Sequence, residues 1–207
     1  LTPASTTIHS SHHHKPPQPC HPNAPPPCPL PPNRPTTLAP TLIIAEHASL
    51  VGTHLIALGA NTAIHPRTKL ISTFASITVG SNCIISERSI VGLQSEPEND
   101  VESEGLVLED SVVVETGAVV EARCVGTGTT VEVGARIGKG AVIGKHCKIG
   151  PLSEIGVGEE IPDFTVIFGN GMRRVDRSGV ENQKLKTIAR QVEVLRKLIP
   201  SNLAKFQ

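Results

Sequence analysis

A branched aliphatic residue recurs at every sixth position between residues 137 and 167 of this chain. A glycine usually follows it, and a small residue usually stands four positions after it. An α-helix cannot use this period, because successive aliphatic side chains would rotate around its axis. A strand-and-turn unit of six residues can, because it turns one aliphatic side chain inward on every pass. The unbroken series is Ile137, Ile143, Ile149, Ile155, Ile161 and Ile167.

The same period extends upstream to about residue 44, with single-residue slips, and predicts a parallel β-helix over residues 41–172. Three hexads make a coil of roughly eighteen residues, so this span holds about six or seven coils. No coil can bury its own aliphatic side chains, and stability must come from the stacking of neighbours. Cys83, Cys124 and Cys147 occupy the small-residue position of their hexads, which predicts buried, unreactive thiols.

Two segments depart from the hexad pattern. Residues 1–40 hold 13 of the 18 prolines and no glycine or acidic residue, which predicts a disordered or polyproline-like tail. The tail also carries five histidines with Cys20 and Cys28, but their spacing matches no compact zinc pattern. Residues 92–105 contain five carboxylates, which predicts a solvated acidic loop between coils. A docking element for a basic partner is the alternative interpretation of that loop.

The hexads stop after Gly171, and residues 173–207 form a linker and a C-terminal helix. Apolar residues spaced by three and four predict an amphipathic helix over residues 181–198, which Pro200 ends. Because the ends and faces of a solenoid need cover, we expect this helix to pack on the β-helix or on a partner. The candidate partner contacts are Arg173, Arg174, Leu185, Ile188, Val192 and Leu195.

The bulk composition argues against several kinds of partner. Nineteen basic and nineteen acidic residues give a formal net charge of zero, which disfavours general binding of nucleic acid or a membrane surface. Four phenylalanines are the only aromatic residues besides histidine, so platforms for stacking bases are scarce. No apolar run approaches the roughly 18–20 residues that would cross a bilayer. We therefore expect no nucleic acid and no direct membrane insertion.

Two kinds of enzyme use hexapeptide solenoids, and the sequence was searched for both. A zinc enzyme resembling the γ-class carbonic anhydrases needs three converging imidazoles, and the repeats offer only His47, His54, His65 and His146, at unsuitable spacings. An acyltransferase needs a general base. His146, flanked by Lys145 and Lys148, is the candidate base, although a solvated corner is the plainer interpretation. No metal site and no cofactor are predicted.

Two segments are more specific than the hexads. The first is Ile64-His65-Pro66-Arg67, and the second runs from Ile161-Pro162 through Thr165-Val166-Ile167-Phe168-Gly169 to Arg173-Arg174-Val175 before the helix. Together they resemble the dynactin subunit 6 family, the 27-kDa pointed-end subunits of dynactin. The resemblance covers about residues 41–200 and implies that the β-helix is left-handed.

The resemblance also implies a function. A member of this family pairs with the related dynactin subunit 5 and joins an actin-related protein and the 62-kDa subunit in the pointed-end complex. There it would support dynein/dynactin transport along microtubules and attachment of cargo, in the cytoplasm and at the cytoskeleton. The sequence-based prediction is therefore a non-catalytic structural subunit, not an enzyme. The alternative is a hexapeptide-repeat acyltransferase that acts as a homotrimer with His146 as general base.

Overall fold

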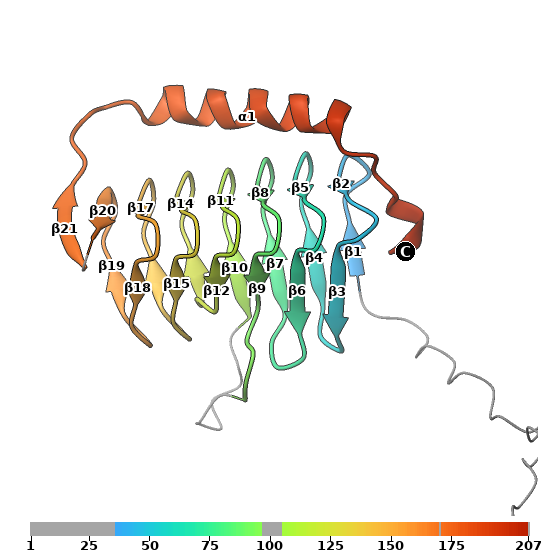
Figure 1. Ribbon diagram of the computed structural model, residues 1–207, viewed down its shortest axis with the longest axis horizontal. Coiled ribbons are helices and arrows are strands. Elements are labelled where there is room, and N and C mark those ends of the chain that lie inside the picture. The colour runs from blue at the N-terminus through green and yellow to red at the C-terminus, as the bar shows by residue number, and fades with distance from the viewer. Residues whose placement is uncertain (1–35, 97–104, 170, 207) are drawn as a thin grey trace, which may run out of the picture. The chain divides into compact units, whose positions relative to one another are not determined.

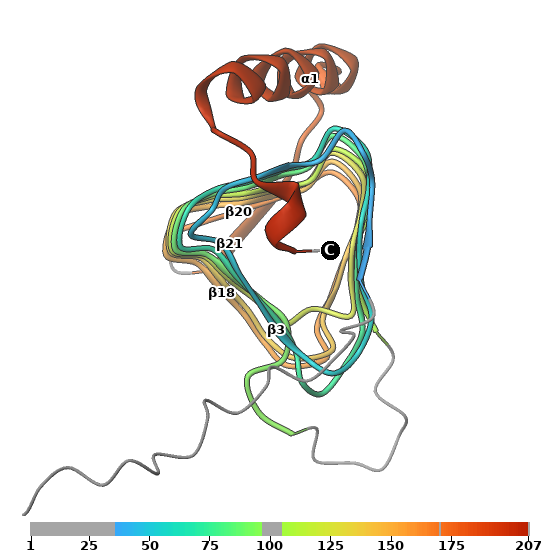
Figure 2. The same cartoon turned by 90° about the vertical axis from the view of Figure 1, so that its right-hand side faces the viewer.

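The computed structural model describes residues 36–96, 105–169 and 171–206. These residues form a left-handed β-helix, in which every turn of the chain passes through three parallel sheets (Figure 1). Six complete turns and the beginning of a seventh are present. Viewed along its axis, the β-helix is a triangular prism (Figure 2). The predicted fold class is confirmed, because one short strand per hexad is what the six-residue period requires.

The strands stack in register within each sheet, and the sheets are numbered here in the order in which the chain enters them. Sheet 1 consists of β1 (Thr36–Leu38), β4 (Ile56–Leu58), β7 (Ile77–Val79), β10 (Leu106–Leu108), β13 (Cys124–Val125), β16 (Val142–Ile143) and β19 (Glu160–Ile161). Sheet 2 consists of β2 (Ile43–Ile44), β5 (Ala63–Ile64), β8 (Ile84–Ile85), β11 (Val113–Val114), β14 (Thr130–Val131), β17 (Lys148–Ile149), β20 (Thr165–Phe168) and β21 (Met172–Val175). Sheet 3 consists of β3 (Ser49–Gly52), β6 (Lys69–Ser72), β9 (Ile90–Val91), β12 (Val119–Val120), β15 (Arg136–Ile137) and β18 (Glu154–Ile155).

The hexad aliphatics form the core of the prism. In sheet 2, for example, each inward residue lies in register with its counterpart one coil away, so that one column runs the length of the solenoid. Its members are almost completely buried. The column consists of Ile44, Ile64, Ile85, Val114, Val131, Ile149 and Ile167.

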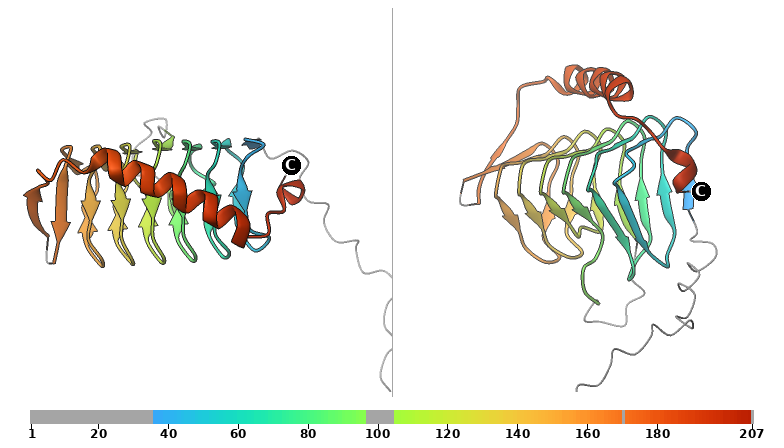
Figure 3. Two further views of the ribbon diagram at one scale, coloured as in Figure 1. Left: turned by 90° about the horizontal axis from the view of Figure 1, so that it is seen from above. Right: turned by 45° about the vertical axis from the view of Figure 1, so that its right-hand side comes forward.

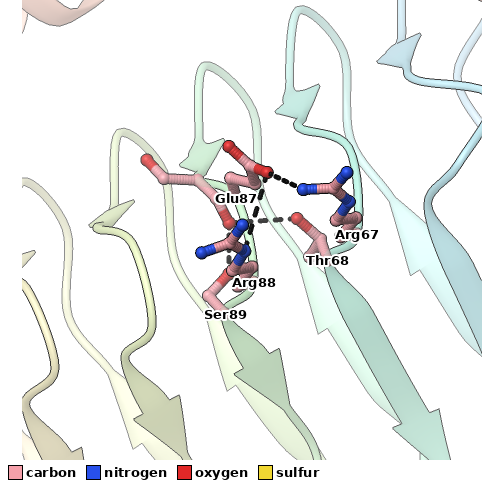
Figure 4. A network of polar contacts seen from close by, with 6 residues as sticks. Arg67, Thr68, Glu87, Arg88 and Ser89 are labelled. Carbon is pink, nitrogen blue, oxygen red and sulfur yellow. Dashed lines mark hydrogen bonds and ion pairs between the residues drawn. The ribbon is translucent and has the colours of Figure 1, made fainter.

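Polar side chains tie neighbouring coils together at the corners. Between sheets 2 and 3, the Glu87 carboxylate lies 3.0 Å from the Arg67 guanidinium of the preceding coil and 3.8 Å from that of Arg88 (Figure 4). Beneath it, the buried hydroxyls of Thr68 and Ser89 both donate to the Ser86 carbonyl. The exposed ion pairs contribute at most about 1 kcal/mol each, whereas the two hydroxyls are fully buried and need the hydrogen bond to this carbonyl.

Both ends of the solenoid are covered by the chain itself. At the C-terminal end, β21 turns back and pairs antiparallel with β20. At the N-terminal end, the short helix η1 (Leu203–Lys205) lies across the opening, with Leu203 and Phe206 packed against the core (Figure 2). The Thr36 hydroxyl donates to the Phe206 carbonyl, which fixes the two ends of the described chain to each other.

Helix α1 (Glu181–Leu198) has the bounds that the sequence predicts. It runs along the outer face of sheet 2 from the level of β17 to that of β2 (Figures 1 and 3). Its eighteen residues span about 27 Å, a length that covers between five and six coils at about 4.8 Å each. Ile188 and Val192 are buried against Ile43, Ala63 and Ile84. The helix therefore packs on its own solenoid, although Leu198, predicted for the same stripe, is 69% exposed.

Three other sequence-based expectations concern the start of the β-helix, the two segments outside the hexad pattern and membrane-spanning helices. Regular structure is already present at Thr36, the first described residue and five positions before the predicted start at residue 41, because β1 pairs with β4. The tail as far as residue 35, with its histidines and Cys20 and Cys28, lies outside the described residues, as does most of the acidic loop, residues 97–104. Among the residues that are described, no helix combines the length and apolar character needed to cross a membrane.

The prediction for the cysteines is confirmed at two positions and wrong at the third. Cys83 and Cys147 are buried, and their thiols lie 3.1 and 3.2 Å from carbonyl oxygens of the next coil. A one-residue slip at Val120–Val125 places Cys124 directly before the inward valine, so its side chain faces outward and is only half-buried. Ala122 fills the small core position instead.

Burial controls the acidity of these thiols. It raises the pKa of Cys83 to about 12, and it also raises the pKa values of Cys124 and Cys147. At neutral pH all three are therefore protonated, and the thiol form is a poor nucleophile.

We expect Ile137→Ala to lower the free energy of unfolding by about 2–5 kcal/mol, because it empties a position that is 1% exposed between two neighbouring coils. Val133→Ala, at a corner position that is 49% exposed, should change stability by no more than about 0.5 kcal/mol. Urea denaturation followed by circular dichroism measures both. Equal losses in the two variants would contradict the stacked-column account of stability.

We expect iodoacetamide to label Cys124 of the native protein slowly at neutral pH and much faster above pH 9, as its thiolate forms. Cys83 should stay unlabelled throughout this range because its pKa is raised to about 12. Peptide mass spectrometry distinguishes the sites, and labelling in urea provides the control in which burial no longer protects either thiol. Labelling of Cys83 as fast as Cys124 in the native state would refute the assignment.

Candidate functional site

The side chains best suited to take part in a reaction lie on the C-terminal coils, at the corner between sheets 1 and 2. Here His146 adopts a left-handed backbone conformation, with φ of 53°. Its ring stacks on Phe164 of the next coil, with 5.4 Å between the ring centres. On the other side lies Gly128, where an added Cβ would come within 2.6 Å of His146 Nδ1 and 3.3 Å of Leu185. Glycine is needed there because the imidazole occupies the space.

Charged groups surround this corner without orienting the imidazole. The Glu109 carboxylate accepts hydrogen bonds from the Thr127 amide at 2.9 Å and from its hydroxyl at 2.7 Å. The hydroxyl bond, assisted by the positive charge of Lys145, lowers the pKa of Glu109. Asp163 accepts a hydrogen bond from the Lys145 amide at 2.7 Å. His146 Nδ1 is buried with no hydrogen-bond partner among the described residues.

The other solenoid histidines lie apart from this corner. The backbone carbonyl of Ser72 lies 2.9 Å from His54 Nδ1, and His47 is exposed at an N-terminal corner. Burial lowers the pKa of His65, whose Nε2 has no partner within the described ranges. Across residues 36–96, 105–169 and 171–206, no three histidine, cysteine, aspartate or glutamate side chains come together as metal ligands.

A second feature lies on the outer face of sheet 2, beside β17 and β20. It is a shallow depression of about 330 Å³, and we call it the sheet 2 depression. Lys148 forms an ion pair with Glu132 at 2.8 Å within it. The residues that line it are Glu132, Lys148, Gly150, Pro151, Val166, Ile167, Phe168 and Arg174.

The predicted partner contacts divide into three groups. Ile188 and Val192 are buried under α1, and Leu185 and Leu195 are half-buried there, so these four stabilise the packing of the helix on its own chain. Arg173 forms an ion pair with Glu159. Arg174 is exposed and borders the sheet 2 depression, and it is therefore the member of the set that a ligand or partner could reach.

Sequence reasoning missed Lys184 and Phe168. Lys184 stands four residues before Ile188 and eight before Val192, on the stripe of α1 that faces sheet 2. That spacing was visible in the sequence. Phe168 could not have been identified, because only the turn from β20 into β21 places it beside Lys148 and Arg174.

No protein-family model matches the sequence, and no curated protein matches it. Solved structures do match the fold. A hexapeptide transferase family protein from Anaplasma phagocytophilum aligns at TM-score 0.66 and 16% identity, over 78% of this chain and 92% of that one. AntD, an N-acyltransferase from Bacillus cereus, in complex with dTDP and 3-hydroxybutyryl-CoA, aligns at TM-score 0.55 and 15% identity, over 74% and 90% of the two chains.

These comparisons correct the prediction that the chain is not an enzyme, because the structures that share its fold are transferases. That prediction followed from the resemblance to the dynactin subunit 6 family, and from the absence of a recognisable catalytic motif along the sequence. A linear search of that kind cannot detect groups that neighbouring coils bring together, such as Glu109, Thr127 and Lys145. At these identities the likeness establishes the fold, and this chain is a hexapeptide-repeat β-helix.

Proposed function

We propose that this chain is an acyltransferase of the hexapeptide-repeat class, which takes its acyl group from acyl-CoA or an acyl carrier protein. The observation that supports this most is the fold likeness to the Anaplasma phagocytophilum hexapeptide transferase family protein, at TM-score 0.66 over 78% of the chain. The N-acyltransferase AntD, whose complex contains an acyl-CoA, shares the same architecture.

In this proposal His146 is the general base. It removes the proton from a hydroxyl or amine of the acceptor, whose oxygen or nitrogen then bonds to the acyl carbon. The thioester C–S bond breaks, and the thiol leaves with a proton. Because Nδ1 is buried against Gly128, Nε2 is the nitrogen that would face the acceptor. Lys145 supplies positive charge at the same corner.

Assembly as a homotrimer belongs to the proposal, and the outer face of sheet 1 suits it. Among the residues that the structure describes, helix α1 covers the apolar part of sheet 2 and does not lie over sheet 1 (Figure 2). The outward row of sheet 1 carries no charge until Glu160. Its earlier members, aligned from coil to coil, are Thr37, Ala57, Thr78, Val107, Cys124 and Val142.

The test is acyl transfer from a panel of acyl-CoA donors to amine and sugar acceptors, with products identified by mass spectrometry. We expect His146→Asn to lower kcat/KM by about 10²–10⁴-fold, the usual contribution of a general base. Asparagine tolerates the left-handed backbone, so the corner should stay folded. His47→Asn, at an exposed corner, is the matched control and should keep full activity.

Two outcomes would contradict this proposal. The first is the absence of both acyl-CoA binding and transfer with every donor of the panel. The second is a chain that stays monomeric by sedimentation at micromolar concentration. Equal activity of the His146→Asn and His47→Asn variants would remove His146 from the mechanism.

A second candidate is a subunit of the dynactin pointed-end complex that pairs with dynactin subunit 5. The specific support is the hairpin formed by the exit segment, which leaves Arg174 exposed, together with the outward row of sheet 1, which carries no charge before Glu160. A rigid flat face of this kind suits a neighbouring solenoid. Dynein-dependent transport and a place at the cytoskeleton would follow from this assembly.

For this candidate we expect dynactin subunits in near-stoichiometric amounts when the tagged chain is purified from its own cells. Replacing Arg173 and Arg174 together by glutamate should greatly reduce their recovery, because the charge of the exposed hairpin reverses. Replacing Arg190, on the exposed side of α1, serves as the control. Quantitative mass spectrometry measures the ratio, and recovery of the wild-type chain alone would contradict this candidate.

A further inference from the structure

The outer face of sheet 2 changes character along its length. Its outward row begins with apolar residues that α1 covers, and it ends with a charged, uncovered part beside the start of the helix. The change follows Val113, where Thr130 and Lys148 replace aliphatic residues in the same register. The row, in spatial order, is Ile43, Ala63, Ile84, Val113, Thr130, Lys148, Val166 and Arg174.

Lys184 extends the helix stripe over this charged part. It shares the face of α1 that buries Ile188 and Val192, so its side chain is directed toward sheet 2 and is itself half-buried. Within the described residues, no carboxylate lies within ion-pair distance of Lys184 or of Arg174. A half-buried cation without a partner is costly unless something neutralises it.

The charges around Lys184 do not balance. Burial and repulsion from Lys148 lower its pKa, while Asp176 and Glu132 act in the opposite direction. Glu132 is already paired with Lys148, and the Asp176 carboxylate accepts a hydrogen bond from the Ser178 amide. Lys148, Lys184 and Arg174 thus carry three positive charges near the two negative charges of Glu132 and Asp176, which leaves one net positive charge for an anion.

The sheet 2 depression adds an apolar surface beside these cations. Phe168 is 38% exposed at its edge, and Val166 and Pro151 contribute to its lining. Its volume of about 330 Å³ is at the lower limit of sites that hold small molecules. An anion with a flat apolar body fits this combination better than a free inorganic ion, since the body can cover Phe168 while the charge lies near the lysines.

We propose that the sheet 2 depression binds a phosphate monoester with a flat apolar body, whose phosphate lies between Lys148, Lys184 and Arg174. A phosphate accepts hydrogen bonds from ammonium and guanidinium groups together. The site lies on the outer face of sheet 2, beside β17 and β20, and the proposal does not depend on acyl transfer.

Phenyl phosphate is the probe, and isothermal titration calorimetry at low salt measures its binding to the full-length chain. We expect saturable binding that weakens with added NaCl, because the site is partly exposed and its charges are screened. Lys184→Gln should weaken binding at least tenfold. Lys186→Gln, which removes the same charge from the exposed side of α1, should leave it unchanged. Phe168→Ala should weaken the binding of phenyl phosphate but leave the binding of inorganic phosphate unchanged.

A second readout tests the position of the phosphate. In a chain with methyl-labelled lysines, phenyl phosphate should raise the pKa of Lys184 in an NMR titration, because a neighbouring anion favours the ammonium form. Urea denaturation of the Lys184→Gln variant verifies that it is folded. Absence of phenyl phosphate binding, equal effects of Lys184→Gln and Lys186→Gln, or equal affinity for inorganic phosphate would each overturn the proposal.

Discussion

Register between coils is the constraint on which this structure depends. Every inward aliphatic pairs with the equivalent residue of the next coil, so a column such as Ile44, Ile64 and Ile85 excludes water only if no strand slips. Because side chains alternate between the two faces of a strand, a slip of one residue would expose the column. Strands of two residues suffice in the interior of a sheet because each is hydrogen-bonded to a neighbour on both sides, as β11 is to β8 and β14.

The β20–β21 hairpin, η1 and α1 cover the ends and the apolar face that the stacking of coils leaves exposed. A parallel sheet with exposed end strands offers unpaired amides and carbonyls to other chains. The β20–β21 hairpin covers one end of sheet 2, and η1 with Leu203 and Phe206 covers the other end of the prism. Helix α1 covers the apolar part of sheet 2, which would otherwise be an exposed patch of Ile43, Ala63 and Ile84. Within the described ranges α1 covers neither sheet 1 nor sheet 3, and the outward row of sheet 1 carries no charge before Glu160.

The two candidate sites differ in how closely their side chains are packed and in the charge that surrounds them. At the His146 corner the imidazole fills space against Gly128 and Phe164, and a catalytic role would use Nε2, because Nδ1 is buried. At the sheet 2 depression, packing is incomplete and charge dominates, since Lys184 lies half-buried beside Lys148 without a carboxylate of its own. Both sites lie on the C-terminal coils, where α1 begins.

The sequence by itself determined the solenoid, its core and the bounds of α1, because a six-residue period and a 3–4 spacing each permit one regular structure. It placed Cys124 in the core wrongly, since one inserted or deleted residue reverses the direction of a side chain. Only the tertiary structure decided that Ile188 and Val192 are buried in their own chain, that Phe168, Lys148 and Arg174 line one depression, and that Lys184 of α1 lies near Lys148. These residues are distant in sequence, and the geometry of stacking coils and a returning helix, rather than any local pattern, brings them close.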